Sequence, residues 1–351
     1  MFISTLRCSL KKGLVLLALF YIGLLSACAE RSKTSVLAFE GPTMGTRFHV
    51  KVIVSASVDV EQQRARLLDI SQDKLREINQ SMSTYISDST LQIFNQTGVD
   101  VWFDVDAELC EVLSVADTVS QASFGAFDIS VGPLVNAWGF GPYDVEELPS
   151  ENDIQTIMAN IGYESLDLDC ASNQIRKQKM LTLDLSSVAK GYAADLLAEE
   201  YSQLGYADFM IEIGGELFVR GLNAERQPWL IAIEKPAFER SGAIQVLQLS
   251  DVGVATSGEY RNYYERDGQR VSHTIDPTTG HPINHTLASV TVITDSAGEA
   301  DAWATALNVL GPEKGQQLAE QLGLAAYFIV RKDDGFIVNY TSSFTQYMVN
   351  P

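Results

Sequence analysis

The chain has 351 residues, of which 46% are hydrophobic and 20% charged, a composition typical of a globular protein that excludes a disordered or polytopic membrane protein. Its 45 acidic and 25 basic residues give a formal net charge of −20, which disfavours nucleic acid as a partner because like charges repel. A phosphorylated small ligand would need a local positive element here, such as a metal ion.

The N-terminus resembles a bacterial lipoprotein signal. Arg7, Lys11 and Lys12 make it basic, and residues 13–25 are an apolar run too short to span a bilayer of ~30 Å as a helix. The run ends in Leu-Ser-Ala-Cys, a pattern similar to the lipobox, in which Cys28 becomes the lipidated first residue of the mature chain. An ordinary signal peptide with a coincidental cysteine is the alternative.

This signal predicts three segments, namely a signal peptide over residues 1–27, a tether over 28–40 and one domain over 41–351. Two cysteines remain in the domain, Cys110 and Cys170, which could form one disulfide in an oxidising compartment or stay as two separate buried thiols. Neither belongs to a Cys-x-x-Cys pair, so a cysteine-ligated metal is disfavoured.

Apolar residues recur at helical or alternating spacing along most of the domain. Because strands and helices do not alternate regularly, the pattern indicates an α+β fold, and the glycine motifs of the common nucleotide-binding folds are missing from the sequence. In chain order, we predict a strand at 48–54, helices at 61–82, 108–121, 150–161 and 188–204, strands at 209–213, 216–219, 229–234, 244–249 and 289–293, a helix at 297–310, and strands at 325–331 and 335–339.

Glycines and a capping pattern mark several of the predicted helix ends. Gly162 and Gly205 follow the third and fourth predicted helices, and we expect them to be C-caps. Ser296, with Glu299 three residues later, is a capping box that opens the last helix, and Gly311 followed by proline is expected to end it.

Several segments combine glycine, hydroxyl, carboxylate and aromatic residues in a way that favours chemistry over packing, although a plain loop or cap is the alternative for each. The longest of them is expected to wrap or floor a pocket, because so apolar an irregular segment must be packed. In chain order the segments are GPTMGT (41–46), MSTY (82–85), GAFDISVGPLVNAWGFG (125–141), DLSSVAKGY (184–192), ATSGEYRNY (255–263), SHTIDPTTG (272–280) and EADAWATAL (299–307).

The segment around Ser186 and Ser187 predicts an anion-binding helix start. The two serines come between a strand and a helix, and the NH groups in the first turn of a helix are free to donate to an anion. Asp184 and Lys190 stand on either side of them. A plain N-cap with a surface lysine is the alternative.

Four other residues have side chains suited to a site. Asp301 and Thr305 are one helical turn apart and offer hard oxygen ligands, which suit Mg²⁺ rather than a soft metal; a solvated first-turn aspartate is the alternative. His273 precedes an Asp-Pro turn, which places an imidazole near a loop tip. Tyr85 closes a predicted helix, where an aromatic ring can stack on a planar ligand.

Taken together and in order, these segments resemble the FAD:protein FMN transferases, the ApbE-like flavin transferase lipoproteins. The resemblance runs from about residue 41 to residue 311, and it includes IEIGGEL (211–217), SVTV (289–292) and the lipobox. It implies a T-fold-like α+β transferase domain that binds FAD and Mg²⁺. Such enzymes cut the FAD pyrophosphate, release AMP, and leave FMN esterified to a threonine or serine of a target flavoprotein.

The resemblance also implies roles for single residues. His273 matches the base of the family, and the reference pKa of a histidine near ~6.5 suits it to accept the hydroxyl proton of the target at neutral pH. Met44 and Tyr85 would contact the flavin side. The FAD site would further be lined by Ala126, Phe127, Asp128, Asp184, Lys190 and Ile275, and the metal would be held by Ser187, through its backbone oxygen, Asp301 and Thr305.

By the same resemblance, we expect a periplasm-facing enzyme that a lipid anchors to a membrane, with the inner membrane preferred. Its expected partners are FAD and flavin-carrying subunits of membrane redox complexes, and no nucleic acid. Two alternatives remain. One is a Mg²⁺-dependent FAD pyrophosphatase, in which water takes the place of the protein hydroxyl, and the other is a non-catalytic flavin-binding lipoprotein that stores or delivers FAD.

Overall fold

The computed structural model describes most of the chain after residue 33. The predicted signal peptide, Cys28 and the first part of the predicted tether lie outside the described residues. Among the residues that are described, no helix is long and apolar enough to cross a membrane. The described ranges are 34–142, 145, 147–236, 242–258, 263–266, 269–333 and 335–349.

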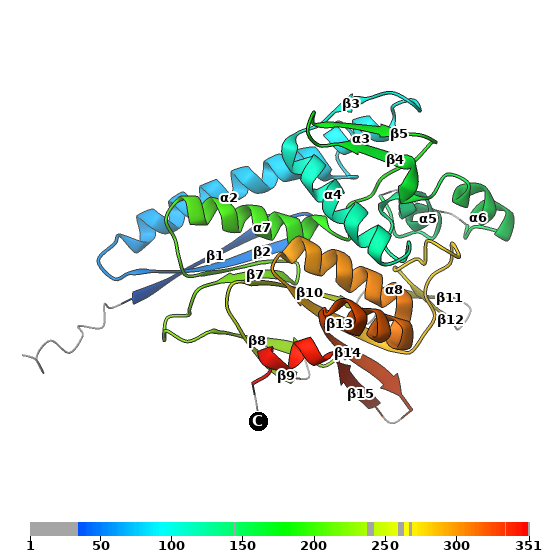
Figure 1. The fold of residues 1–351 in the computed structure, drawn as a ribbon. Coiled ribbons are helices and arrows are strands. Elements are labelled where there is room, and N and C mark those ends of the chain that lie inside the picture. The colour runs from blue at the N-terminus through cyan, green and yellow to red at the C-terminus, as the bar shows by residue number, and fades with distance from the viewer. Residues whose placement is uncertain are drawn as a thin grey trace, which may run out of the picture.

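A sheet of eight antiparallel strands forms the centre of the fold (Figure 1). Some adjacent strands of the sheet follow one another in the sequence and pair as hairpins, whereas other adjacent strands come from distant segments. The sheet therefore brings together residues that are far apart in the sequence. In spatial order its strands are β1 (Thr34–Thr43), β2 (Thr46–Ser55), β6 (Phe209–Ile213), β7 (Glu216–Arg220), β10 (Val252–Gly258), β13 (Leu287–Thr294), β14 (Ala325–Lys332) and β15 (Gly335–Tyr340).

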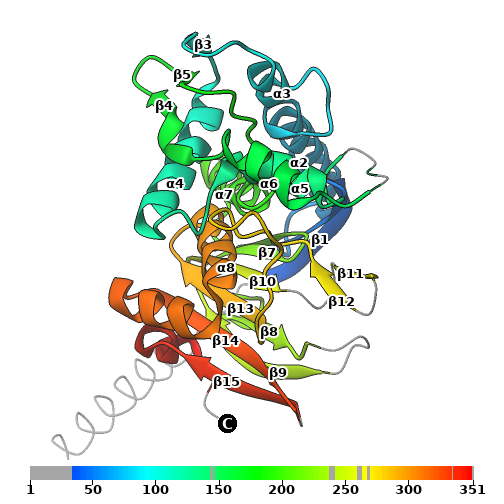
Figure 2. The same ribbon diagram turned by 90° about the vertical axis from the view of Figure 1, so that its right-hand side faces the viewer.

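Three long helices cover one face of this sheet (Figures 1 and 2). Helix α2 (Val60–Met82) packs on β1, α7 (Ala189–Gln203) on β6 and β7, and α8 (Ala297–Leu322) on β10 and β13. Helix α4 (Ala107–Ala122) packs against α8. The main hydrophobic core lies between these helices and the sheet.

The opposite face of the sheet has its own, smaller core. It is covered by the hairpin of β8 (Trp229–Glu234) and β9 (Ala243–Leu249) and by the 3-10 helix η3 (Ser342–Tyr347), which contribute Trp229 and Phe344. Because both faces are covered at the centre, β13 is buried along almost its whole length, as its apolar sequence LASVTVIT requires.

The remaining elements surround the two layers. A three-stranded sheet in the order β3-β5-β4 lies near α4, and β11 pairs with β12 as a separate hairpin. The elements are β3 (Phe103–Asp104), β4 (Leu166–Asp169), β5 (Gln174–Lys177), β11 (Tyr263–Arg266), β12 (Gln269–Ser272), α3 (Thr90–Asn95), η1 (Ile129–Val131), α5 (Gly132–Ala137), α6 (Glu151–Met158) and η2 (Tyr163–Ser165).

Helices α7 and α8 approach each other through backbone contact. A Cβ atom on Gly191 would lie 2.1 Å from the carbonyl oxygen of Ala297, so only glycine allows this approach. One turn further along α7, the carboxylate of Asp195 accepts hydrogen bonds from the backbone NH groups of Ala297 and Gly298 and from the Ser296 hydroxyl. The start of α8 is therefore fixed relative to α7.

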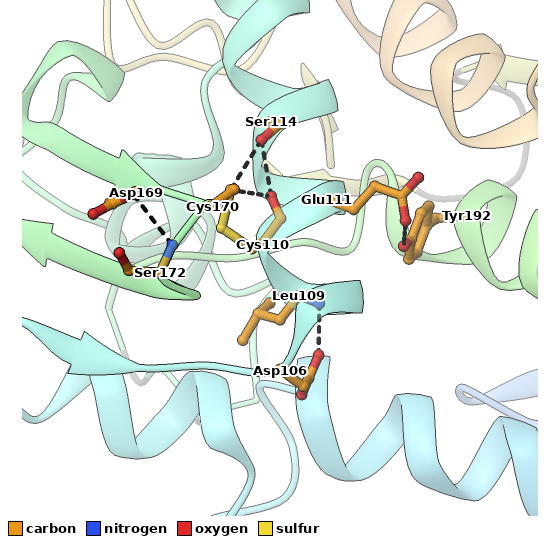
Figure 3. The surroundings of a disulfide bond; sticks show 9 residues. All are labelled: Asp106, Leu109, Cys110, Glu111, Ser114, Asp169, Cys170, Ser172 and Tyr192. Atoms are coloured by element: carbon orange, nitrogen blue, oxygen red, sulfur yellow. Dashed lines mark hydrogen bonds between the residues drawn. A yellow bond between two sulfur atoms is a disulfide. The ribbon is translucent and has the colours of Figure 1, made fainter.

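A disulfide joins Cys110 in α4 to Cys170 just after β4, with their Cα atoms 5.6 Å apart (Figure 3). The sequence leaves open whether these two cysteines pair or stay as separate thiols. The structure contains the disulfide, so the alternative of two separate thiols is wrong. The bond ties α4 to the β4–β5 hairpin. The neighbouring Glu111 accepts a 2.7 Å hydrogen bond from the hydroxyl of Tyr192 in α7, which links this region to the helix layer.

The predicted single α+β domain is confirmed, and most predicted elements are present with ends within two residues of the prediction. The predicted ends of two helices are wrong. Helix α6 stops at Met158, and Gly162 (φ 139°) precedes η2 instead of capping a helix. The chain turns at Gly311 (φ 76°) as expected, but a second helical segment then runs to Leu322, because proline is well tolerated in the first turn of a helix.

Strands β1 and β10 are the main elements that the sequence pattern does not predict. Residues 34–40, expected in a tether, belong to β1, which pairs with β2 from Thr34 opposite Ser55 to Thr43 opposite Thr46. This pairing buries alternate residues of β1 and leaves the others exposed. The described part of the predicted tether is therefore part of the folded domain.

Candidate functional site

A cavity of about 1050 Å³ opens beside the start of α7, the β6–β7 turn and the first turns of α8. The loop before α5, strands β8 and β10 and the segment after β12 complete its walls. All predicted FAD, metal and base residues except Met44 line this one cavity, namely Tyr85, Ala126, Phe127, Asp128, Asp184, Ser187, Lys190, His273, Ile275, Asp301 and Thr305.

The two residues expected on the flavin side are placed differently. Tyr85 is 71% exposed at the rim of the cavity, where its ring is accessible. Met44 does not line the cavity. It forms the two-residue turn between β1 and β2 with Gly45, both at positive φ (46° and 69°), and it packs against the main core. The register of this hairpin decides where Met44 lies.

The Asp128 side chain organises the loop on which it stands. Its carboxylate accepts hydrogen bonds from the backbone NH and hydroxyl of Ser130 (2.8 and 2.6 Å) and from the backbone NH of Tyr163 (3.0 Å). Burial raises the pKa of Asp128, although these hydrogen bonds oppose the change. Most of the hydrogen-bonding capacity of the carboxylate is therefore used by the protein itself. The loop that it organises forms part of the cavity wall, together with the buried Phe127.

Ser186 and Ser187 line the cavity but do not cap α7. The helix begins at Ala189 after Val188, whose side chain makes no capping hydrogen bond, so the alternative of a plain serine N-cap is not found. The serines lie in the preceding turn, where the NH of Ser186 donates to Asp184 Oδ1 at 2.8 Å. This Asx-type turn fixes the loop before the helix. It presents Ser187 to the cavity.

Lys190 lies between two buried carboxylates. Its Nζ atom is 3.1 Å from Glu216 Oε1 and 3.8 Å from Asp301 Oδ2. Burial raises the pKa of both carboxyl groups, while Lys190 opposes both changes. Burial alone would lower the pKa of Lys190, but Asp301 and Glu216 together raise it. Two carboxyl groups share one ammonium here, so the charge of one of them is left for a proton or another cation.

The oxygen atoms around this charge fit a divalent cation. Asp301 and Thr305 stand one turn apart on α8, and Glu216 Oε2 is buried without a hydrogen-bond partner among the residues the structure describes. Carboxylate, hydroxyl and carbonyl oxygens are the ligands that Mg²⁺ prefers. The described ranges contain no group of three or more His, Cys, Asp or Glu side chains that could hold a metal. A cation would therefore also need hydroxyl, backbone and substrate oxygens.

His273 directly follows β12 and faces the cavity. The ring of Phe140 stands edge-on to the imidazole, with ring centroids 6.3 Å apart. Behind it, the NH of Thr274 donates to the Ser272 hydroxyl at 3.1 Å, and Ile275 is buried in a small core with α5 and α6. The imidazole is thus carried by a loop that is packed on both sides.

Several polar residues of the cavity wall are not singled out by the sequence, among them His49, Glu212 and Glu216. His49 Nδ1 is 2.6 Å from Glu212 Oε2, and its Nε2 is 3.1 Å from Glu40 Oε2. Glu212 also accepts a 2.7 Å hydrogen bond from the NH of Gly215. The block IEIGGEL is the signal that could have found both cavity glutamates, because they flank a glycine turn.

Comparison with known proteins gives consistent matches over nearly the whole chain. Residues 44–328 match the ApbE family. The FAD:protein FMN transferase of Haemophilus influenzae is 40% identical over 326 residues, which cover 91% of this chain and 94% of the relative. That of Escherichia coli K12 is 39% identical over 348 residues, covering 96% and 97%.

Solved structures agree with the sequence comparison. The flavin transferase ApbE from Vibrio cholerae superposes with a TM-score of 0.82 at 38% identity, covering 90% of this chain and 99% of that one. The apo form of the Pseudomonas stutzeri flavinyl transferase ApbE gives a TM-score of 0.82 at 40% identity, covering 91% and 98%.

Proposed function

The chain belongs to the ApbE family, and from that premise we propose that it is a Mg²⁺-dependent FAD:protein FMN transferase. The reaction breaks the pyrophosphate bond of FAD, releases AMP and joins FMN by a phosphoester bond to a threonine or serine of a target flavoprotein. The observation that carries the proposal is the meeting of the predicted FAD, metal and base residues in one cavity.

The cavity suits a ligand as large as a dinucleotide. Its volume of about 1050 Å³ is slightly larger than the range of ~300–1,000 Å³ for small-molecule sites. The exposed ring of Tyr85 offers a stacking surface to a planar ring system.

Residues at the start of α7 and on α8 would hold the cation, namely Ser187 through its backbone oxygen, Asp301 and Thr305. When bound, Mg²⁺ offsets phosphate charge and makes the attacked phosphorus more electrophilic. Lys190 compensates the charge of only one of Asp301 and Glu216. The second carboxyl group, whose pKa burial raises, is left to bind a proton or a cation, and this supports a requirement for a divalent cation.

His273 is the proposed general base. As the hydroxyl oxygen of the target attacks the FMN phosphorus, the imidazole accepts the hydroxyl proton. The new oxygen–phosphorus bond forms while the bond to the bridging oxygen breaks, and that oxygen leaves with AMP. The protein thus contributes mainly positioning, charge stabilisation and one proton transfer.

We also propose that the enzyme faces the periplasm, anchored by lipid on Cys28 to the inner membrane, and acts on flavin-carrying subunits of membrane redox complexes. The disulfide between Cys110 and Cys170 supports an oxidising compartment, because such bonds rarely persist in a reducing cytosol. Labelling of cells with a fatty-acid analogue tests the anchor, with label expected on the wild-type protein and lost in Cys28→Ser.

Mass spectrometry of products from FAD, Mg²⁺ and a candidate acceptor tests the function. We expect one FMN adduct on the acceptor and an equal amount of AMP, and no adduct on an acceptor whose target threonine or serine is replaced by alanine. AMP and free FMN at the same rate with or without acceptor would instead indicate a pyrophosphatase. Intact FAD after long incubation with every plausible acceptor would indicate a binding protein.

A further inference from the structure

We propose that Glu216 is a positioning residue that holds the ammonium of Lys190 away from Asp301, and so keeps the Asp301 carboxylate open for the divalent cation. The inference rests on the proposed function, because the cation belongs to that reaction. Glu216 itself is not expected to touch the reacting phosphorus.

The distances around Lys190 show which carboxylate holds it. Its Nζ atom is 3.1 Å from Glu216 Oε1, which is hydrogen-bond distance, and 3.8 Å from Asp301 Oδ2, which is beyond it. Both carboxylates are almost fully buried, with Glu216 6% and Asp301 5% exposed. The ammonium therefore forms its shorter ion pair with Glu216 and a longer one with Asp301.

The β6–β7 hairpin keeps the lysine in this position. The side chain of Lys190 packs on the turn, where a Cβ atom on Gly214 would lie 3.3 Å from Lys190 Cδ. Two residues later, Glu216 opens β7, opposite Ile213 in the strand register. One hairpin thus supports the aliphatic part of the lysine and supplies the counter-charge for its end.

Asp301 keeps one oxygen atom for another ligand. The contacts with Lys190 and with the backbone NH of Gly191, at 3.2 Å, are both made by Oδ2. Within the described part of the chain, no hydrogen bond is made to Oδ1. Thr305, which stands one turn further along α8, also lines the cavity. This pair of oxygens is the one that the proposed cation would use.

Removing the Glu216 charge changes the competition for Asp301. The nearest remaining carboxylate to the ammonium would then be Asp301, and a small movement would shorten their 3.8 Å ion pair to hydrogen-bond distance. A divalent cation would have to displace that ammonium or bind beside it, and both cost free energy because like charges repel. Glu216 therefore acts on the cation through Lys190.

A double-mutant cycle on cation binding tests this relationship. Binding of Mn²⁺ to the FAD-loaded protein is measured by electron paramagnetic resonance of free Mn²⁺, and binding of Mg²⁺ by calorimetry, in wild type, Glu216→Gln, Lys190→Met and the double variant. We expect Glu216→Gln to weaken cation binding about ten-fold or more. Lys190→Met removes a nearby positive charge, so it should strengthen cation binding in both backgrounds, and by a clearly larger factor in Glu216→Gln, where it restores most of the loss.

Two matched variants separate this effect from general loss of charge or structure. Glu212→Gln also removes a negative charge from the cavity wall, but its partner is His49, so we expect a clearly smaller loss. Glu216→Asp keeps the charge and shortens the side chain, so we expect a partial loss. It also gives a folded comparison if the glutamine variant is unstable.

If Lys190→Met changed cation affinity by the same factor in wild type and in Glu216→Gln, the proposal would be overturned. The two side chains would then act on the cation independently of each other. Cation binding by Glu216→Gln equal to that of wild type would overturn it as well. Absence of cation binding to the wild-type protein with FAD would overturn the Mg²⁺ dependence in the proposed function together with this inference.

Discussion

The carboxylate of Asp195 in α7 accepts a 2.7 Å hydrogen bond from the backbone NH of Ala297, the first residue of α8. The same carboxylate accepts hydrogen bonds from the NH of Gly298 at 2.8 Å and from the Ser296 hydroxyl at 2.7 Å. A side chain of one helix therefore caps the start of the next. Since α8 carries Asp301 one turn later, this cap also helps to set the position of the proposed metal ligand.

Replacement of this cap is expected to destabilise the protein. In Asp195→Asn, the amide nitrogen cannot accept hydrogen bonds, so at least one buried NH at the start of α8 loses its partner. We expect a loss of about 1–3 kcal/mol in the free energy of unfolding, measured by urea denaturation. Glu199→Gln on the exposed side of α7, where the carboxylate accepts a hydrogen bond from Gln203, is the control and should stay within experimental error of wild type.

The pH dependence of stability follows from the same carboxyl group. Burial raises the pKa of Asp195 from 3.8 to about 6, against hydrogen bonds that oppose the change. The folded protein binds the proton of Asp195 more tightly than the unfolded chain does, so protonation of Asp195 stabilises the fold. This stabilisation is complete below pH 3.8 and is lost as pH rises through 6. The loss is on the order of 3 kcal/mol.

Wild type and Asp195→Asn should therefore show different slopes of unfolding free energy against pH between pH 4 and pH 7. The variant lacks the titrating group, so the difference between the two curves isolates it from other carboxyls. Parallel curves across this range would contradict the predicted pKa change.

The disulfide between Cys110 and Cys170 should add measurably to stability. It closes a loop with a sequence separation of 60 residues, and such a bond stabilises by about 2–4 kcal/mol, mainly by restricting the unfolded chain. We expect a reductant to lower the melting temperature of wild type. The double variant Cys110→Ser/Cys170→Ser should melt at the lower temperature with or without reductant, and a reductant effect on that variant would point to another cause.

Because α7 and α8 approach each other closely, we expect one added methyl group between them to destabilise the protein. In Gly191→Ala, the new Cβ would lie 2.1 Å from the Ala297 carbonyl oxygen, so the helices must separate, at a cost of about 1–3 kcal/mol. Gly98→Ala is the matched control, because a Cβ there meets no atom within 4 Å and the backbone needs no positive φ. Equal unfolding midpoints for the two variants would show that the contact is not tight.

His273→Ala should separate binding from chemistry. We expect FMN transfer to fall by about 10²–10⁴-fold, the usual contribution of a general base, while FAD affinity measured by flavin fluorescence changes little. His281→Ala is a suitable control, because that ring lies tilted against Trp138, pairs with Glu151 and does not line the cavity. Undiminished transfer in His273→Ala would exclude this histidine as the base.

Much of the fold could be predicted from local pattern. The apolar spacing of α2 and the glycine after α7 act over neighbouring residues, so they can be interpreted without knowledge of the rest of the chain. The order of the motifs likewise identified the family, and the comparisons confirm it. Strand β1 escaped prediction because its stability comes from pairing with β2, which its own composition does not reveal.

The candidate site was predictable as a set of residues but not as an arrangement. Motifs selected the cavity residues, yet they also selected Met44, which the hairpin register places in a turn against the core. They did not assign a role to Glu216, whose partner Lys190 is far from it in the sequence. Residue type indicates which chemistry is available, but not which groups will be neighbours.

The amino-acid sequence by itself determined the local helices and strands, the family and the side chains available for a phosphoryl transfer, because periodicity and short motifs depend only on nearby residues. Only the tertiary structure decided that Cys110 pairs with Cys170, and that Lys190 has Glu216 as its closest carboxylate partner and Asp301 beyond it. Such relationships arise when strands and helices from distant segments pack on one sheet, since that packing sets the distances between charges and so their competition for one another.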